Sequence, residues 1–327
     1  MRLRDLLSRS AKQRLKAGLR RLRGLLPWAG REEVEALYRL LHRMVHDRDQ
    51  ALDLAALQTK DAFAREWDEF REGLYLASDP WFKANVARII SEEELQIRPE
   101  WFKGKDVLDA GCGNGRWAIG LAELGANVSV VDINENAVEE TRKVLAPYPV
   151  RTEFYVAPLE DLSRVLPGRR YDLVWCWGVL HHCRSFTRSF REVSQAVKDM
   201  GLLYLYLYGR ETRPLEDDLE LFKERVRFQV MFGEDRYRFL LKKAGGDVRR
   251  LHNLHDLYAP LINRRFEFAE IRTLLEGEGF GDVIRTILHT DLFILAIKGS
   301  SEPLQAWVLP PRQPPFWFER HERLVTR

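Results

Sequence analysis

The chain has 327 residues, of which 45% are hydrophobic and 31% charged, and its net charge is +3. This length and balance describe an ordinary soluble protein, built as one large α/β domain with additions or as two small domains. No run approaches the roughly 20 apolar residues of a membrane span, and the N-terminus lacks the apolar core of a signal peptide. The three cysteines form no C-x-x-C pair and favour a reducing compartment. We therefore expect a cytoplasmic protein.

The first segment, residues 1–30, is a basic arm. It holds nine Lys or Arg against one acid, a net charge of +8 that leaves −5 for residues 31–327. Leucines recur at helical spacing with the cations largely between them, which is typical of a basic amphipathic helix. Such a helix can lie on an anionic membrane surface, cover RNA or pack on the body of the protein. Residues 2–26 are therefore a candidate for peripheral membrane contact.

Residues 31–104 are expected to form a helical cap ahead of the first strand. The periodicity predicts a helix at 31–57, with Leu52 and Leu54 among its inward-facing residues. Aromatic residues then follow in quick succession at 63–102, and they could close a ligand cleft, although we expect core positions for most of them.

The rest of the chain is organised around residues 106–115, Asp-Val-Leu-Asp-Ala-Gly-Cys-Gly-Asn-Gly. A short apolar run that contains Asp109 ends in three glycines at alternate positions, and helical periodicity then continues to a glycine stop at Gly125. The unit is therefore a strand, a glycine loop and a helix. A loop of this kind brings backbone N–H groups and a helix N-terminus close to a ligand.

The spacing of the glycines indicates which ligand the loop suits. The dinucleotide fingerprint G-x-G-x-x-G would need a glycine at position 116, which is Arg, so the pattern here is G-x-G-x-G. Asp132 ends the second apolar run, where a carboxylate can accept both hydroxyls of a ribose. With its motif at 109–115, the chain resembles the class I S-adenosylmethionine-dependent methyltransferases over roughly residues 63–298.

Apolar runs and helical patterns alternate through the body of the chain. Strands are predicted at 106–110, 127–131, 152–156, 171–176 and 201–208, with a final hairpin of 282–287 and 291–298. Helices are predicted at 115–124, 135–146 and 187–198. The alternation implies a parallel, doubly wound sheet, and the resemblance implies that the hairpin ends it. The expected fold is α/β, a mostly parallel seven-stranded sheet of the Rossmann-like methyltransferase type at residues 105–298.

The resemblance implies S-adenosyl-L-methionine as cofactor. The implied site consists of Asp109, Gly111, Cys112, Gly113, Asn114, Gly115, Asp132, Ile133, Leu159, Glu160, Trp177 and Gly178. The N–H groups of the glycine loop are expected to face the amino-acid end of the cofactor, and Trp177 and Gly178 its sulfonium. Where the family usually has an acidic residue for the adenine amino group, this chain has Pro158. The adenine role is therefore carried over only loosely, to Leu159 and Glu160.

The fourth strand is followed by Val-Leu-His-His-Cys at 179–183, which matches a segment common in small-molecule methyltransferases. His181 or His182 could act as a general base, since an unperturbed imidazole titrates near neutral pH, or both could hold the loop through hydrogen bonds. We expect no metal site here, because adjacent side chains do not easily converge on one ion.

Residues 209–281 are longer than one crossover needs, and the resemblance implies a lid over the acceptor. A charged helix is predicted at 215–232, and a second helix at 266–279 returns the chain to the hairpin. Acceptor contacts are expected from the loop between them. The candidates are His255, Asp256, Tyr258, Arg264 and Arg265, with His255 and Asp256 also as catalytic candidates. The tail at 299–327 is rich in proline and aromatic residues, so we expect it to lack regular structure and either to wrap the body or to mediate self-association.

The sequence thus predicts a methyltransferase acting on a hydroxyl or amine of a small or lipid-linked molecule. Three alternatives stay open: an RNA-modifying enzyme of the same fold, a non-catalytic cofactor-binding protein recruited to membranes, and transfer of a group other than methyl. The acidic remainder of the chain argues against nucleic acid as a partner.

Overall fold

The computed structural model describes residues 48–69, 79–210, 215–247, 250–300 and 302–319. The basic arm at 1–30 and most of the helix expected at 31–57 lie outside these ranges.

A seven-stranded sheet forms the centre of the molecule. Its strands are β1 (Asp106–Ala110), β2 (Asn127–Asp132), β3 (Thr152–Val156), β4 (Tyr171–Trp177), β5 (Val197–Leu207), β6 (Phe280–Leu288) and β7 (Leu292–Lys298). The order is β3-β2-β1-β4-β5-β7-β6, in which β1 to β5 are parallel and β7 runs antiparallel to both neighbours. The predicted α/β, mostly parallel seven-stranded fold is therefore confirmed. The strand order reverses between β1 and β4, which is where such sheets bind ligands.

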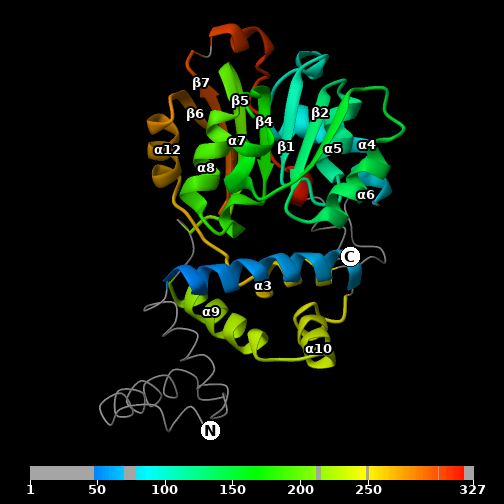
Figure 1. Cartoon of the computed structure of the whole chain (residues 1–327), viewed down its shortest axis with the longest axis vertical. Coiled ribbons are helices and arrows are strands. Elements are labelled where there is room, and N and C mark those ends of the chain that lie inside the picture. The colour runs from blue at the N-terminus through cyan, green and yellow to red at the C-terminus, as the bar shows by residue number, and fades with distance from the viewer. Residues whose placement is uncertain (1–47, 70–78, 211–214, 248–249, 301, 320–327) are drawn as a thin grey trace.

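Helices cover both faces of the sheet (Figure 1). On one face lie α4 (Pro80–Arg88), the π-helical turn η3 (Ile89–Glu94), α5 (Arg116–Glu123) and α6 (Glu135–Leu145), and on the other α7 (Leu162–Val165), α8 (Phe186–Gln195) and α12 (Phe268–Gly277). Each layer buries its own apolar cluster against the strands. Because both faces are covered, the central strands β1 and β2 are almost continuously buried, as parallel strands usually are.

A separate helical layer lies across the carboxyl ends of the parallel strands (Figure 1). It consists of α3 (Arg48–Glu69), α9 (Leu215–Gln229), α10 (Glu234–Lys243) and α11 (Leu251–Tyr258), which share a small apolar cluster centred on Phe228 and Tyr258. In the view of Figure 1, α3 lies directly beneath the α/β body, with α9 and α10 beyond it. An early segment of the chain and the long insertion before α12 are thus packed together.

The last described segment runs back along the first helical layer. A 3₁₀ helix, η8 (Glu302–Trp307), is followed by a single bridge between Ile97 and Val308, and the segment ends with Phe316 and Trp317 buried. The expectation that the tail lacks regular structure was therefore wrong for η8, whose Pro303 stands in the first turn, where a missing N–H costs nothing. Of the two expected roles, residues 302–319 show the wrapping of the body.

Several predicted boundaries differ from the structure. Helix α3 continues to Glu69, and Leu54, expected to face inward, is 48% exposed. The helix expected at 187–198 ends at Gln195, because Val197 already pairs with Tyr171 in the sheet.

Candidate active site

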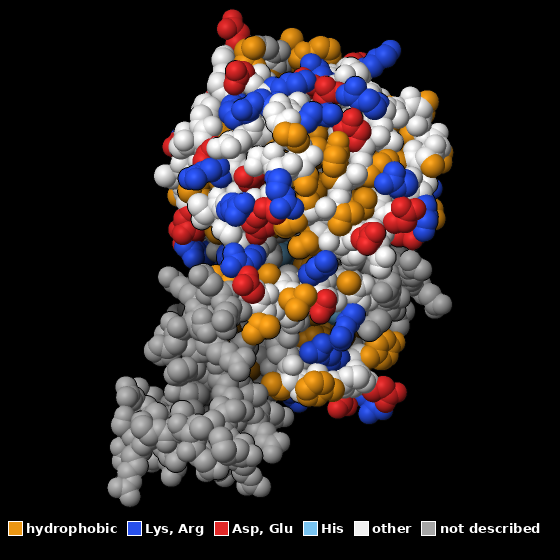
Figure 2. Space-filling model, viewed as in Figure 1, with side chains coloured by type: hydrophobic (Ala, Val, Ile, Leu, Met, Phe, Trp, Pro, Cys, Tyr) orange, Lys and Arg blue, Asp and Glu red, His pale blue; other side chains and the backbone are white. Residues whose placement is uncertain are grey.

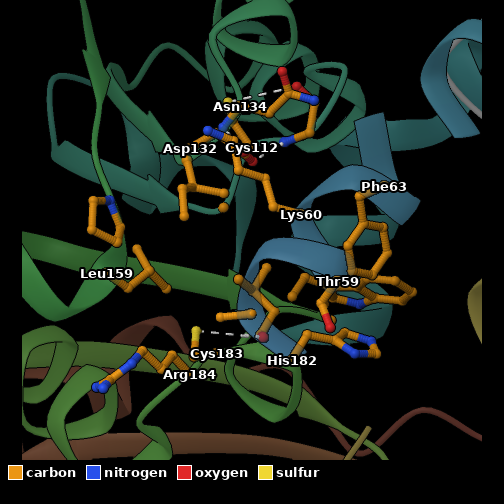
Figure 3. A pocket seen from close by; sticks show the side chains of 18 of the residues that line it. Thr59, Lys60, Phe63, Cys112, Asp132, Asn134, Leu159, His182, Cys183 and Arg184 are labelled. Atoms are coloured by element: carbon orange, nitrogen blue, oxygen red, sulfur yellow. Dashed lines mark hydrogen bonds between the residues drawn. The ribbon is translucent and has the colours of Figure 1, made fainter. Parts of the chain in front are cut away.

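A cavity of about 470 Å³ opens at the carboxyl ends of β1, β2, β4 and β5 and is closed on its outer side by α3. Figure 3 shows side chains from α3, the glycine loop, the end of β2 and the segment after β4 converging on it. Ten of the twelve residues predicted for the cofactor line this cavity. The other two, Asp109 and Gly115, are buried and are not among its lining residues.

The glycine loop after β1 is shaped by close packing. Gly111 has a φ of 92°, and a Cβ built there would lie 2.3 Å from Cγ2 of Val179, so the loop and the segment after β4 approach too closely for any side chain. The N–H groups of Gly111 and Cys112 donate to the carbonyl of Val131, and that of Gly113 donates to the Asp132 carboxylate. The expectation that these N–H groups are offered to the ligand was wrong, because the loop uses them to hold itself against β2.

Asp132 is held firmly at the end of β2. Its Oδ2 accepts the N–H of Gly113 at 3.0 Å and its Oδ1 accepts the N–H of Asn134 at 2.8 Å. Burial raises the pKa of this carboxyl, while these backbone hydrogen bonds lower it. The carboxylate thus has a fixed orientation at the cavity wall, where each oxygen keeps capacity for a further donor.

Two oxygen atoms near the glycine loop are buried and, among the described residues, lack a hydrogen-bond donor. They are Oδ2 of Asp109 and Oδ1 of Asn114. Burial, helped by the negative charge of Asp132 and opposed by Arg116, raises the pKa of Asp109 to about 8. Buried acceptors without donors are costly, so this end of the cavity suits a ligand that carries a positive, hydrogen-bonding group.

At the opposite end, the cavity is lined by Ile133, Pro158, Leu159 and Glu160. Ile133 is 42% exposed although it is apolar, so it offers a surface against which a flat ligand can lie. Oε1 of Glu160 already accepts the N–H of Ser185, the residue that caps the N-terminus of α8.

An aromatic wall lines the cavity on the side of β4 and β5. Trp177, at the end of β4, stacks on Tyr206 of β5 with ring centroids 4.1 Å apart, and the rings of Trp117 and Trp177 are 5.2 Å apart. Both tryptophans, Tyr206 and Gly178 line the cavity, as does Tyr208 just after β5. Tyr206 and Tyr208 were missed from the sequence. Their alternation with Tyr204 was the available signal, since it places all three on one face of a strand.

The two adjacent histidines face different surroundings. They lie in the 3₁₀ turn η6 (Leu180–His182), in which successive side chains point in different directions. His181 is fully buried against the ring of Tyr208, is not among the lining residues, and neither ring nitrogen has a hydrogen-bond partner among the described residues. Burial, the neighbouring His182 and two arginines lower the pKa of His181 well below its usual value. The structure therefore contradicts a role for His181 as general base.

His182, in contrast, lines the cavity, and its tautomer is defined. Its Nδ1 lies 2.6 Å from the carbonyl oxygen of Ile262, and because a carbonyl only accepts, Nδ1 carries the proton. In the neutral ring the lone pair is then on Nε2. Phe63 of α3 packs edge-on against the imidazole at a centroid distance of 5.0 Å (Figure 3).

The carbonyl that orients His182 is itself held by α3. Thr59 Oγ1 accepts the N–H of Ile262 at 3.1 Å. Gln58 accepts the N–H of Leu261 and donates to the carbonyl of Ala259, both at 2.9 Å. The position of the candidate base therefore depends on a helix more than a hundred residues earlier in the chain.

The segment expected to be an acceptor loop at 254–265 begins as a helix, α11, and this changes the role of its residues. His255 is buried near Phe228 and is not among the lining residues, so the structure contradicts it as a catalytic candidate, whereas Asp256 lines the cavity. Tyr258 donates to Glu224. Arg264 donates to the carbonyls of Cys183 and Arg184, and the Arg265 guanidinium lies over the ring of Tyr208. None of these three residues lines the cavity, so the structure does not place them as acceptor contacts.

The contribution of α3 was not predicted from the sequence. Ala56, Thr59, Lys60 and Phe63 all line the cavity. Their spacing is helical, but so is that of any packing helix, and nothing in the sequence shows which surface the helix covers. Within the described ranges, no group of three or more His, Cys, Asp or Glu is arranged to hold a metal ion, and no helix is long and apolar enough to cross a membrane.

A doubly wound sheet with an antiparallel last strand, a glycine loop after β1 and a fixed carboxylate after β2 define a nucleotide-binding domain of the methyltransferase type. Residues 107–201 match a family model described as "Methyltransferase domain". This part of the chain is therefore similar to methyltransferase domains, the family that the motif at 109–115 resembles.

Curated relatives are similar over part of the chain. A ubiquinone biosynthesis O-methyltransferase of Xanthomonas euvesicatoria is 33% identical over 107 residues, which are 33% of this chain and 44% of that protein. One from Bordetella avium is 28% identical over 166 residues, 50% of this chain and 64% of the relative. The chain thus spans roughly half the length of these relatives. Among solved structures, a magnesium protoporphyrin IX methyltransferase from Synechocystis with bound S-adenosylmethionine is 17% identical, with a TM-score of 0.45 over 75% of this chain and 97% of that one.

Proposed function

We propose that this protein transfers a methyl group from S-adenosylmethionine to a hydroxyl group of a small molecule, with His182 as general base. The observation that carries this proposal is the placement of His182, whose Nδ1 proton is committed to Ile262 and whose ring lines the same cavity as the glycine loop. The curated relatives are named as O-methyltransferases, which supports oxygen rather than nitrogen as the acceptor atom.

The residues around the glycine loop fit the cofactor. Asn114 lines the cavity, and its oxygen, which lacks a donor among the described residues, suits an ammonium group. Asp109, two residues before Gly111, adds a negative charge beneath the loop when it is ionised, and the fixed carboxylate of Asp132 suits the hydroxyls of a ribose. Ile133 and Leu159 offer apolar surface for the adenine. Pro158 stands where the family usually has an acidic residue, so this position supplies no carboxylate to the adenine amino group. Bound there, S-adenosylmethionine supplies a methyl group on a positively charged sulfur.

The chain's own contribution is alignment and proton removal. Holding acceptor and donor in line lowers the barrier by as much as about 7–11 kcal/mol, and the closure of the cavity by α3 serves this purpose. Nε2 of His182 then takes the proton of the acceptor hydroxyl, which contributes on the order of 10²–10⁴-fold in rate.

The aromatic surroundings favour a flat, largely apolar acceptor. Phe63, Tyr206, Tyr208 and Trp177 all line the cavity close to His182 or to one another. We propose a small aromatic or lipid-linked molecule, which the helical layer of α9–α11 helps to enclose as a lid. Residues 2–26 would bring the protein to an anionic membrane in the lipid-linked case.

Nucleic acid is not a proposed partner. On the face shown in Figure 2, Lys and Arg side chains are interspersed with Asp and Glu over the described residues rather than gathered in one basic stripe. An RNA-binding face would need such a stripe.

The test is a transfer assay with methyl-labelled cofactor and fractionated extract of the source cell. Label is expected in the small-molecule or organic-solvent fraction. His182→Asn should lower turnover by about a hundredfold or more while calorimetry shows nearly unchanged cofactor affinity. Asp132→Ala should abolish both. Label in RNA, or cofactor binding without transfer to any fraction, would refute the proposal.

A further inference from the structure

We infer that the C-terminal segment at 307–318 is a positioning element for the active site, in which Trp317 supports the aromatic wall from behind. The inference rests on the proposed function for its catalytic meaning, but its structural part can be tested without any ligand.

The indole of Trp317 is buried between the first helical layer and the aromatic wall. Its ring centroid lies 5.7 Å from that of Trp117 and 6.3 Å from that of Trp177, both of which line the cavity. On its other side it meets Phe82 of α4 at 5.6 Å. A side chain from the end of the described chain therefore fills the space directly behind two residues that would touch the ligands.

The position of this indole is fixed by two buried carboxylates of η3. The backbone N–H of Trp317 donates to Oε2 of Glu93 at 2.7 Å, and its Nε1 donates to Oε1 of Glu94 at 2.5 Å. Both glutamates are fully buried. Glu93 also forms ion pairs with Arg88 at 2.8 Å and with Arg312 at 3.3 Å. Because Arg312 belongs to the C-terminal segment, this segment supplies one of the two positive charges that balance Glu93.

Glu94 also connects Trp317 with β5, the strand that carries Tyr206 of the aromatic wall. Glu94 accepts the hydroxyl proton of Tyr204, which stacks on Trp175 with centroids 4.5 Å apart. Tyr204 and Tyr206 lie two positions apart on one face of β5, opposite Trp175 and Trp177 of β4. Phe316 and Phe318 add a second contact, because they pack in the cluster that supports Tyr206.

The earlier part of the segment is attached to residues 96–98, mainly by backbone hydrogen bonds. Leu309 donates its N–H to the carbonyl of Gln96, Arg98 donates its N–H to the carbonyl of Trp307, and the Arg98 guanidinium lies over the Trp307 ring. In Figure 1 the segment runs from η8, at the top of the view, toward the α3 end of the sheet. Trp307 thus belongs to the same segment as Trp317, but among the described residues its ring is not paired with any ring of the aromatic wall.

That difference supplies a matched control. Trp317→Ala removes the support of the wall, whereas Trp307→Ala removes a tryptophan of the same segment that does not line the cavity and has no described ring contact with the wall. Trp317→Phe keeps a smaller aromatic ring and loses the N–H donated to Glu94. Because Trp317 contacts two tryptophans that line the cavity, its loss should be measurable in ligand affinity.

The first measurement is hydrogen–deuterium exchange of the full chain without ligand. Trp317→Ala should lower the protection of residues 175–179 and 204–208 at least several-fold, and Trp307→Ala should not. If Trp317→Ala folds with unchanged circular dichroism and unchanged exchange in both stretches, the inference is refuted, whatever the protein binds. Should Trp317→Ala fail to fold, Trp317→Phe supplies the test, with a smaller loss of protection in the same two stretches.

The second measurement is the affinity for S-adenosylhomocysteine by calorimetry and the kinetics of transfer. We expect Trp317→Ala to weaken binding about tenfold, which corresponds to about 1.4 kcal/mol, and Trp317→Phe to lower kcat more than it raises KM. Wild-type affinity in Trp317→Ala would overturn the positioning role. A wild-type chain that binds no S-adenosylhomocysteine would instead refute the proposed function, and the exchange experiment would still decide the inference.

Discussion

Asp109 shows how one buried side chain sets the electrostatics of the glycine loop. It is a carboxyl group with an unsatisfied oxygen, next to Asp132, and its pKa of about 8 means that it is largely protonated at neutral pH in the ligand-free chain. A ligand with a positive charge favours the ionised form, so binding should release a proton.

The affinity for S-adenosylmethionine should therefore depend on pH. Below pH 8 the proton on Asp109 competes with the ligand's positive charge, so the affinity should rise between pH 6 and pH 8, with a limiting slope of about tenfold per unit. Calorimetry in the absence of acceptor measures this rise. Asp109→Asn keeps the shape and cannot ionise, and it also serves as the control for titration of the ligand itself. An equal slope in Asp109→Asn would remove Asp109 from the explanation.

At the scale of single residues, the position of the candidate site was predicted well from the sequence, but the roles of its individual side chains were not. The glycine loop and Asp132 were found because their conformation and charge are local properties of a strand followed by a loop. The choice between His181 and His182 was not, because it depends on the rotation of a 3₁₀ turn and on the Ile262 carbonyl 80 residues later. Burial of His255 likewise depends on α11, which the pattern did not reveal.

At the scale of elements, α3 does more than cover the cavity. Its Gln58 and Thr59 hold the segment at 259–262, and this segment holds His182. The helix therefore connects closure of the cavity with the orientation of the candidate base.

Gln58→Ala should lower kcat by about tenfold, because a small displacement of the base is costly in near-attack geometry. The cofactor dissociation constant should change less than threefold, since Gln58 does not line the cavity. Leu57→Ala, at a neighbouring position that is 57% exposed, is the matched control and should behave as wild type. Equal loss in both variants would point to general destabilisation of α3 rather than to positioning.

The strands and α9 were predicted within a few residues of the structure, whereas the packing of α3 against the ends of the strands was not. A buried parallel strand has an apolar run that can be read locally. The elements that pack against α3 cannot be identified locally in the sequence. The contacts of α3 with α9 and with the end of α11 join parts of the chain about 170 to 200 residues apart.

At the scale of the whole molecule, the pH dependence of stability should reflect the buried carboxyl groups. Burial raises the pKa of Glu94 to about 7, above its ordinary value of 4.5, although Tyr204 and Trp317 donate to it. A folded-state pKa above the unfolded one means that folding takes up a proton, so the stability that Glu94 contributes is complete below about pH 4.5 and is lost as the pH rises toward 7.

Glu94→Gln should therefore become more stable relative to wild type as the pH rises from 5 to 8. The glutamine oxygen still accepts a hydrogen bond from Trp317 or Tyr204, so most of the packing should survive. Melting temperatures of both proteins across this range measure the difference, and a constant difference at every pH would contradict the prediction.

The C-terminal segment also affects how the protein can be made. Trp317 packs against Trp117 and Trp177, so the core of the sheet is completed by residues that are translated well over a hundred positions after β4. A chain still attached to the ribosome would have β1 to β4 outside the exit tunnel while the space behind the aromatic wall was still empty. During that interval the two tryptophans would be covered only by a chaperone or by solvent. The cavity therefore reaches its final shape only late in synthesis. Shortened chains that end before η8 should be recovered as aggregates or with bound chaperones.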